Sequence, residues 1–194
     1  MKTKRKFLTT IIGALAYMTT SLRNSDAAFI FRGKIDEKII KGIPKSWVDL
    51  KGKEVYDYAE FILDLNLKNI TPRMVLEPHF KSRKGIKNEL PPKKMWKKLK
   101  PTLKLLDEVV DETGMKVRSI VSAYRSPEYN RAVRGKSRSL HMYNNALDVS
   151  FSNTSPWRAA KVMRQYRSKR KFKGGIGTYS SFIHVDTRGE NVDW

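Results

Sequence analysis

Three short segments in the C-terminal half of the chain alternate apolar and polar residues, a pattern typical of strands with one buried face. They are KVRSIVS (116–122), NALDVSF (145–151) and FIHVDT (182–187). Helical patterns stand before and between them, over 54–65, 93–113, 126–134 and 155–170. Because the order has no regular strand–helix–strand repeat, the sequence predicts one α+β domain over residues 54–194.

The N-terminal region does not resemble this domain. Residues 1–27 combine a basic start, MKTKRK, with a short apolar run and small residues, and this order is typical of a secretory signal peptide. An ordinary basic N-terminal helix is the alternative. Residues 28–53 have no clear period, and they are expected to form an irregular segment. We therefore expect an exported protein, located in the periplasm or associated with the cell wall.

The composition limits the chemistry and the partners. The chain has no cysteine, which excludes disulfides, thiolate zinc sites and cysteine nucleophiles. Its formal net charge of +21 indicates an anionic partner: nucleic acid, acidic lipid or a cell-wall polymer. The cations are dispersed along the chain and no nucleic-acid motif is present. We therefore expect an anionic cell-wall or membrane surface as partner, and not nucleic acid.

Two of the three histidines stand beside predicted strands that also carry aspartates. Alternation places Asp148 on the face opposite Leu147 and Val149, and it places His184 with Asp186. If the two strands are neighbours, His141, Asp148 and His184 converge. Two imidazoles and one carboxylate suit Zn²⁺ and leave a fourth position for a reactive water. The alternative is that His141 packs in the fold and Asp148 pairs with an arginine.

Three motifs occur in one order along the chain: SAYRSPEYN (122–130), SLHMYNNALD (139–148) and GGIGTYSSFIHVDTRG (174–189). Together they resemble the zinc D-Ala-D-Ala carboxypeptidase family and its relatives, the murein endopeptidases and the phage L-alanyl-D-glutamate peptidases. The resemblance implies a small antiparallel sheet flanked by helices, with a hedgehog-like or D-Ala-D-Ala-peptidase-like fold. It also implies one Zn²⁺ bound by His141, Asp148 and His184, and hydrolysis of peptide bonds in peptidoglycan stem peptides. A monomer is expected.

The same resemblance implies two substrate-binding residues. Arg125 matches a family arginine that binds a substrate carboxylate, for which a planar guanidinium is well suited. Ser139 is expected to assist the geometry of the substrate or of a ligand. The alternative for Arg125 is a salt bridge that stabilises the fold.

Two positions depart from the family pattern. Asn144 replaces a glycine, and asparagine tolerates a positive φ better than other residues. Ser181 stands where many relatives have a carboxylate base, which leaves Asp186 as the nearest acidic residue. We expect Asp186 to be the base, or alternatively to orient a metal ligand or to pair with Arg188 or Arg125. Ser181 also supports a second hypothesis, a zinc domain that binds muropeptides without turnover.

Overall fold

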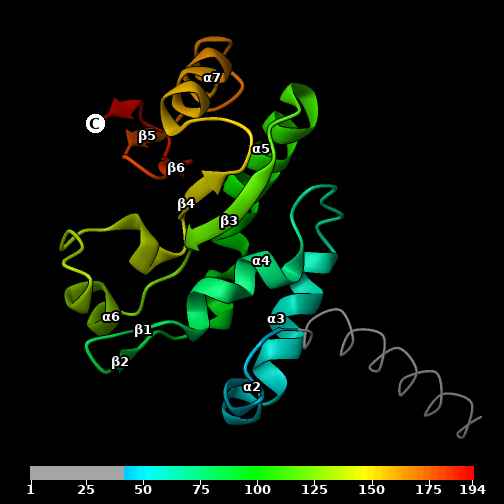
Figure 1. Cartoon of the computed structure of the whole chain (residues 1–194), viewed down its shortest axis with the longest axis vertical. Helices are drawn as coiled ribbons and strands as arrows, with labels where there is room; N and C mark the ends of the chain where they lie inside the picture. The colour runs from blue at the N-terminus through cyan, green and yellow to red at the C-terminus, as the bar shows by residue number, and fades with distance from the viewer. Residues whose placement is uncertain (1–41) are drawn as a thin grey trace, which may run out of the picture.

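The computed structural model describes residues 42–194, so the predicted signal peptide and most of the predicted irregular segment lie outside the described residues. The helices in chain order, with 3₁₀ helices as η, are α2 (Lys45–Lys51), α3 (Lys53–Leu63), α4 (Pro72–Leu76), η1 (Glu77–Phe80), η2 (Lys93–Met95), α5 (Trp96–Thr113), α6 (Pro127–Ala132), η3 (Leu140–Tyr143) and α7 (Pro156–Ser168). The strands are β1 (Ser82–Arg83), β2 (Ile86–Lys87), β3 (Val117–Ser122), β4 (Ala146–Phe151), β5 (Gly175–Thr178), β6 (Ile183–Asp186) and β7 (Val192–Asp193). Figure 1 shows their arrangement.

The main sheet has five strands in the order β3–β4–β6–β5–β7, and β1 and β2 form a separate hairpin. All pairs in the main sheet are antiparallel except β5 with β7. The predicted α+β class and the predicted strands are confirmed. The short strand β7 had no alternating pattern in the sequence, because two residues are too few to show one.

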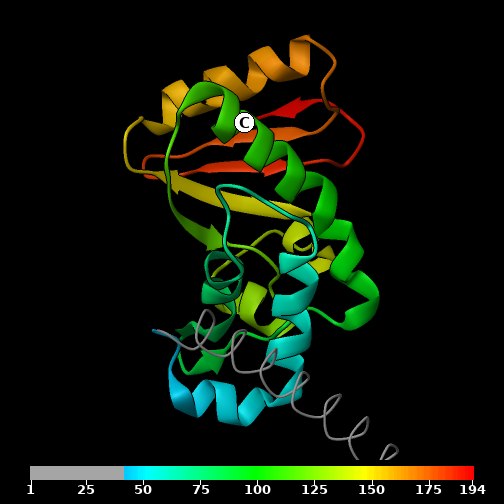
Figure 2. The same cartoon turned by 90° about the vertical axis from the view of Figure 1, so that its right-hand side faces the viewer.

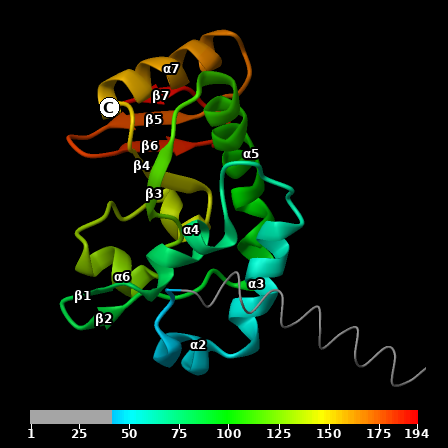
Figure 3. The same cartoon turned by 45° about the vertical axis from the view of Figure 1, so that its right-hand side comes forward.

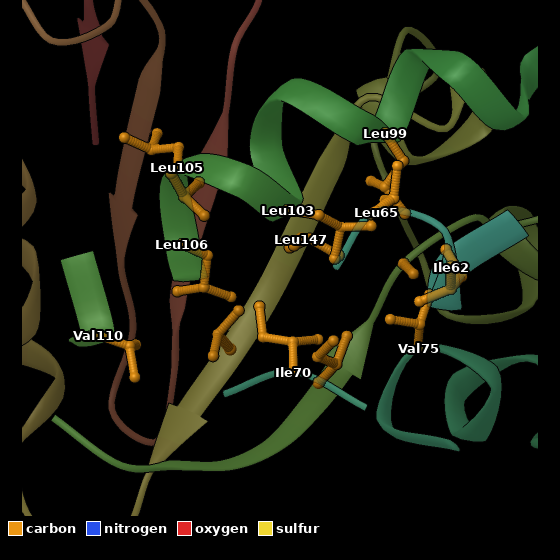
Figure 4. Close-up of a cluster of buried hydrophobic side chains, with 14 of the residues drawn as sticks. Ile62, Leu65, Ile70, Val75, Leu99, Leu103, Leu105, Leu106, Val110 and Leu147 are labelled. Atoms are coloured by element: carbon orange, nitrogen blue, oxygen red, sulfur yellow. The ribbon is translucent and has the colours of Figure 1, made fainter. Parts of the chain in front are cut away.

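Helices α5 and α7 cover the apolar face of this sheet (Figure 2). Leu99, Leu103 and Leu106 of α5 are fully buried, and Figure 4 draws them beside Leu147 of β4. The two helices are linked to one another by the Tyr166 hydroxyl, which donates to Glu112. Their coverage of one face leaves the opposite face of β4 and β6 for polar side chains.

Local sequence signals explain where the helices begin and end. Ser126 caps α6 and Ser155 caps α7, each accepting a backbone N–H through its hydroxyl with proline next in the chain. Gly114 ends α5 in the left-handed conformation at φ 67°. Pro101, which could have divided this helix, lies inside it without interrupting it.

One prediction about the N-terminal region is wrong. Residues Lys45–Lys51 form helix α2 and are not irregular. Trp47 and Val48 are buried in the core, and the Trp47 ring meets that of Phe80 edge-on at 5.6 Å. A helix of seven residues is too short to show a clear period in the sequence. Its apolar side chains pack against residues about thirty positions later in the chain. The folded unit therefore includes residues before 54.

Within residues 42–194, no helix combines the length and the apolar character that crossing a membrane requires.

Candidate metal centre

The polar face of the main sheet brings the candidate ligands together. Asp148 of β4 lies directly opposite His184 of β6 in the antiparallel register. His141 lies in η3, just before β4. The turn between them is made by Asn144, whose φ of 53° is left-handed and whose side-chain amide donates to the Met95 carbonyl. Asparagine thus fills the position of the expected glycine at small cost.

Three ligand atoms face one another at the centre. His141 Nε2 lies 3.1 Å from Asp148 Oδ1, His184 Nδ1 lies 3.0 Å from the same oxygen, and the two nitrogens are 3.2 Å apart. Ligands bound to Zn²⁺ at about 2.0–2.1 Å are separated by about 3.3 Å in a tetrahedron. The spacing therefore fits a cation of this size, and the three side chains are all buried.

The second ring nitrogen of each histidine, which points away from the centre, also has a polar partner. His141 Nδ1 lies 2.7 Å from the Ala123 carbonyl, and His184 Nε2 lies 3.0 Å from Asp186 Oδ2. When these outer atoms donate, both inner nitrogens present lone pairs toward the Asp148 carboxylate. Three acceptors at this distance require a proton or a metal cation between them. Outer contacts of this kind are usual for histidines that bind a metal.

The protonation states of the three candidate ligands favour the binding of a cation. Burial lowers the pKa of His141, which keeps this imidazole neutral. Burial raises the pKa of Asp148, but His141 and His184 outweigh it and hold this pKa well below its usual range. Burial likewise lowers the pKa of His184, but its hydrogen bonds to Asp148 and Asp186 leave this pKa raised. A metal at the centre therefore competes with a proton on His184.

The contacts of Asp186 are those of the alternative role, which is to orient a metal ligand and to pair with Arg188; its role as the catalytic base stays a prediction. Asp186 is fully buried and lies on the outer side of His184. Its Oδ1 accepts from the Gly175 N–H and from the backbone and Nε of Arg188, and its Oδ2 accepts from His184 and from Arg188 Nη2 at 2.6 Å. Burial raises its pKa, but Arg188 and His184 hold the pKa well below the usual range. A carboxylate so fully engaged orients His184 and pairs with Arg188.

Arg125 and Ser139 each contact a residue of the metal centre. Arg125 Nη2 donates to Asp148 Oδ2 at 2.5 Å and Nε donates to Ser122 at 2.7 Å, so the salt-bridge alternative is present. This contact turns the other Asp148 oxygen toward the histidines. The Ser139 hydroxyl caps η3 by accepting the His141 N–H at 3.4 Å. Substrate binding by either residue stays a prediction.

Sequence reasoning missed the role of Trp194. Its indole lies 4.9 Å from the His184 ring, and its Nε1 donates to the Tyr179 hydroxyl at 2.8 Å. Across β5, Gly177 pairs with His184, and a Cβ at Gly177 would lie 2.6 Å from this indole. The glycines of GGIGTY therefore make room for a tryptophan against the site. The Tyr179 ring stacks on that of Phe182 with centroids 4.5 Å apart.

The third histidine is away from this cluster. His79 is fully buried in η1, with Nδ1 3.2 Å from the Leu76 carbonyl and its ring edge-on to Tyr58. Its contacts are structural. Burial lowers its pKa to about 4.

This depressed pKa predicts a pH-dependent stability. The unfolded chain binds a proton at His79 near pH 6.5 and the folded chain only near pH 4, so stability falls as pH decreases through this window. The histidine should account for a loss of about 3 kcal/mol between pH 7 and pH 4. Urea unfolding at both pH values measures it. A His79→Gln variant should lose less over the same interval, and an equal loss in both proteins would contradict the assignment.

The fold and the centre together are those of a metallopeptidase domain. The family model described as Peptidase M15 matches residues 69–186, which include every candidate ligand, and the chain belongs to this family. No curated protein and no solved structure gave a match.

Proposed function

We propose that the protein is a zinc-dependent peptidase that hydrolyses peptide bonds in peptidoglycan stem peptides, as a carboxypeptidase or an endopeptidase. One observation carries the proposal: His141, Asp148 and His184 direct three ligand atoms to one point. The second polar atom of each side chain has its own partner, which is the Ala123 carbonyl, Arg125 or Asp186 respectively. Family membership supports the peptidase class.

The roles of the residues follow from these contacts. Zinc, when bound, supplies a Lewis acid and an activated water. The Ala123 carbonyl and Asp186 hold the two imidazoles in the tautomers that leave the inner nitrogens free of protons. Arg125 uses Nε and one Nη for Ser122 and Asp148, and its other N–H groups are available in our proposal for a substrate carboxylate.

Export and an anionic partner belong to the same proposal. A signal peptide over residues 1–27 would deliver the protein to the periplasm or the cell wall, where its substrate is located. The positive charge would then favour residence on anionic wall or membrane polymers.

A second candidate function is a zinc domain that binds muropeptides without cutting them. The carboxylates that contact the two histidines are Asp148 and Asp186, and both are fully engaged. Ser181, at the position of the expected base, is exposed and has no carboxylate. These observations favour a domain of low turnover.

Digestion of purified peptidoglycan separates the two functions. We expect the protein without residues 1–27 to release peptide fragments, detected by mass analysis, and to release none with a chelator because the inner ligands act only through a metal. Addition of zinc should restore release. Retention of soluble muropeptides with zinc but without any cleavage would establish the binding domain instead.

A further inference from the structure

One surface beside the metal centre carries a concentration of cations. It is formed by the β1–β2 hairpin and by α6 with the loop that follows it, and these elements pack together (Figures 1 and 3). Seven basic side chains in these segments are exposed, and we call them the basic lobe. They are Arg83, Lys84, Lys87, Arg131, Arg134, Lys136 and Arg138.

The charge of the basic lobe is not neutralised within the described chain. None of its seven side chains has an ion-pair partner among residues 42–194. The one acidic residue in 81–88 and 127–138 is Glu128. Glu89, which follows the hairpin, pairs with Lys51 at 2.6 Å.

Some basic residues elsewhere in the domain are paired. On α7, Arg164 and Arg167 both bind Asp193, and beyond it Lys171 binds Glu108. With seven exposed cations and Glu128 as the one acidic residue of its segments, the basic lobe is a local excess of positive charge. Like charges held together raise the energy of the folded chain unless an anion binds there.

The lobe is held rigidly by buried amides. Asn88 accepts the Ser126 N–H and donates to the carbonyls of Tyr124 and Pro78, which ties the hairpin to the start of α6. Asn130 donates to the Lys136 carbonyl, and a Cβ at Gly135 would lie 2.0 Å from the Asn130 side chain. The backbone that carries the basic side chains is therefore fixed before binding, which lowers the entropy cost of ordering it.

The lobe is continuous with the metal centre. Asn88 contacts the residues on both sides of Arg125, and the Arg125 N–H donates to the His141 carbonyl at 3.1 Å. Arg138 directly precedes Ser139, the cap of the helix that contains His141. An anionic polymer bound at the lobe would therefore lie next to the site of cleavage.

We infer that the basic lobe binds carboxylates of peptidoglycan stem peptides that neighbour the peptide at the metal centre. The inference rests on the proposed function, whose substrate polymer carries such carboxylates at repeated positions. Arginine and lysine provide the complementary charge. The one aromatic residue in 81–88 and 127–138 is Tyr129, which is buried, so these segments offer no exposed stacking platform for nucleic-acid bases.

The experiment measures binding of the full chain to intact peptidoglycan sacculi with a chelator present, so that cleavage does not enter. The test variant replaces Arg83, Lys84, Arg134 and Arg138 by glutamine. The matched control replaces Lys94, Lys98, Lys100 and Lys104 by glutamine, which are exposed, lie on η2 and α5 and form no ion pair within the described residues. Both variants lose four charges, and Figures 1 and 3 place α5 away from the lobe.

At 0.1 M salt we expect the test variant to bind about tenfold more weakly than the unmodified chain, because several exposed ion pairs act together. We expect binding of the control variant to weaken by less than about twofold. Added salt should weaken binding of the unmodified chain. Sacculi with amidated carboxylates should lose binding, and sacculi stripped of phosphodiester polymers should retain it.

Equal losses of binding in the two variants, dependence on the phosphodiester polymers, or tighter binding to duplex DNA than to sacculi would each overturn the inference. None of these readings requires hydrolysis, so they are independent of the proposed activity.

Discussion

Replacing His184 by alanine is expected to remove the bound metal and with it all hydrolysis. His184 supplies one of three inward ligand atoms, and its Nδ1 lies 3.0 Å from Asp148 Oδ1 and 3.2 Å from His141 Nε2. With two protein ligands left, we expect metal affinity to fall by at least about a thousandfold. Metal analysis after dialysis, together with the peptidoglycan digest, measures both effects.

His79 provides the matched control for this experiment. It is also a buried histidine, but it lies in η1 and contacts the Leu76 carbonyl. His79→Ala should lower the free energy of unfolding by about 2 kcal/mol or more and should keep one metal per chain. Full metal content in His184→Ala, or loss of metal in a folded His79→Ala, would refute the assignment of the ligands.

The sequence predicted the meeting of the ligands because strand alternation is a local property. The alternating apolar residues Leu147 and Val149 fix which face of β4 packs on the apolar core, and Asp148 must then lie on the other face. The same argument applies to His184 between Ile183 and Val185. That the two strands are neighbours, with Asp148 opposite His184, was an assumption that the register now confirms.

Features that depend on contacts between distant segments were not predictable in this way. Asp148 lies on the polar face of β4 but is only 3% exposed, because Arg125 and both histidines surround it. Trp194 is placed against His184 by the parallel pairing of β7 with β5, which no local pattern encodes. Neither arrangement has a signature in spacing or composition.

The hydrogen bonds of Asp186 were not predictable for a related reason. Alternation correctly placed it on the same face as His184, but spacing alone does not reveal which of its oxygens are already bonded. Arg188, two residues later, donates three hydrogen bonds to it, and the Gly175 N–H donates another. A carboxylate that accepts this many donors is a poor proton acceptor.

Asp186→Asn is therefore expected to weaken metal binding and to destabilise the fold without removing a catalytic base. The amide cannot accept every donor that the buried carboxylate accepts, and it removes the counter-charge of the Arg188 guanidinium. We expect a loss of about 2 kcal/mol in unfolding free energy and a loss of about 10–100-fold in metal affinity. Denaturant unfolding and a competitive metal titration measure these two quantities.

Metal rescue decides between the two roles of Asp186. If this residue only orients His184, activity of Asp186→Asn should recover most of its loss when zinc is raised until the site is filled, because the chemistry at the metal is unchanged. If it is the base, the filled variant should remain slower by about two to four orders of magnitude, the usual contribution of general acid–base catalysis. Arg188→Gln tests the same contact from the other side. It keeps the Asp186 carboxylate, so an orienting role predicts partial loss of metal affinity and the same recovery with zinc.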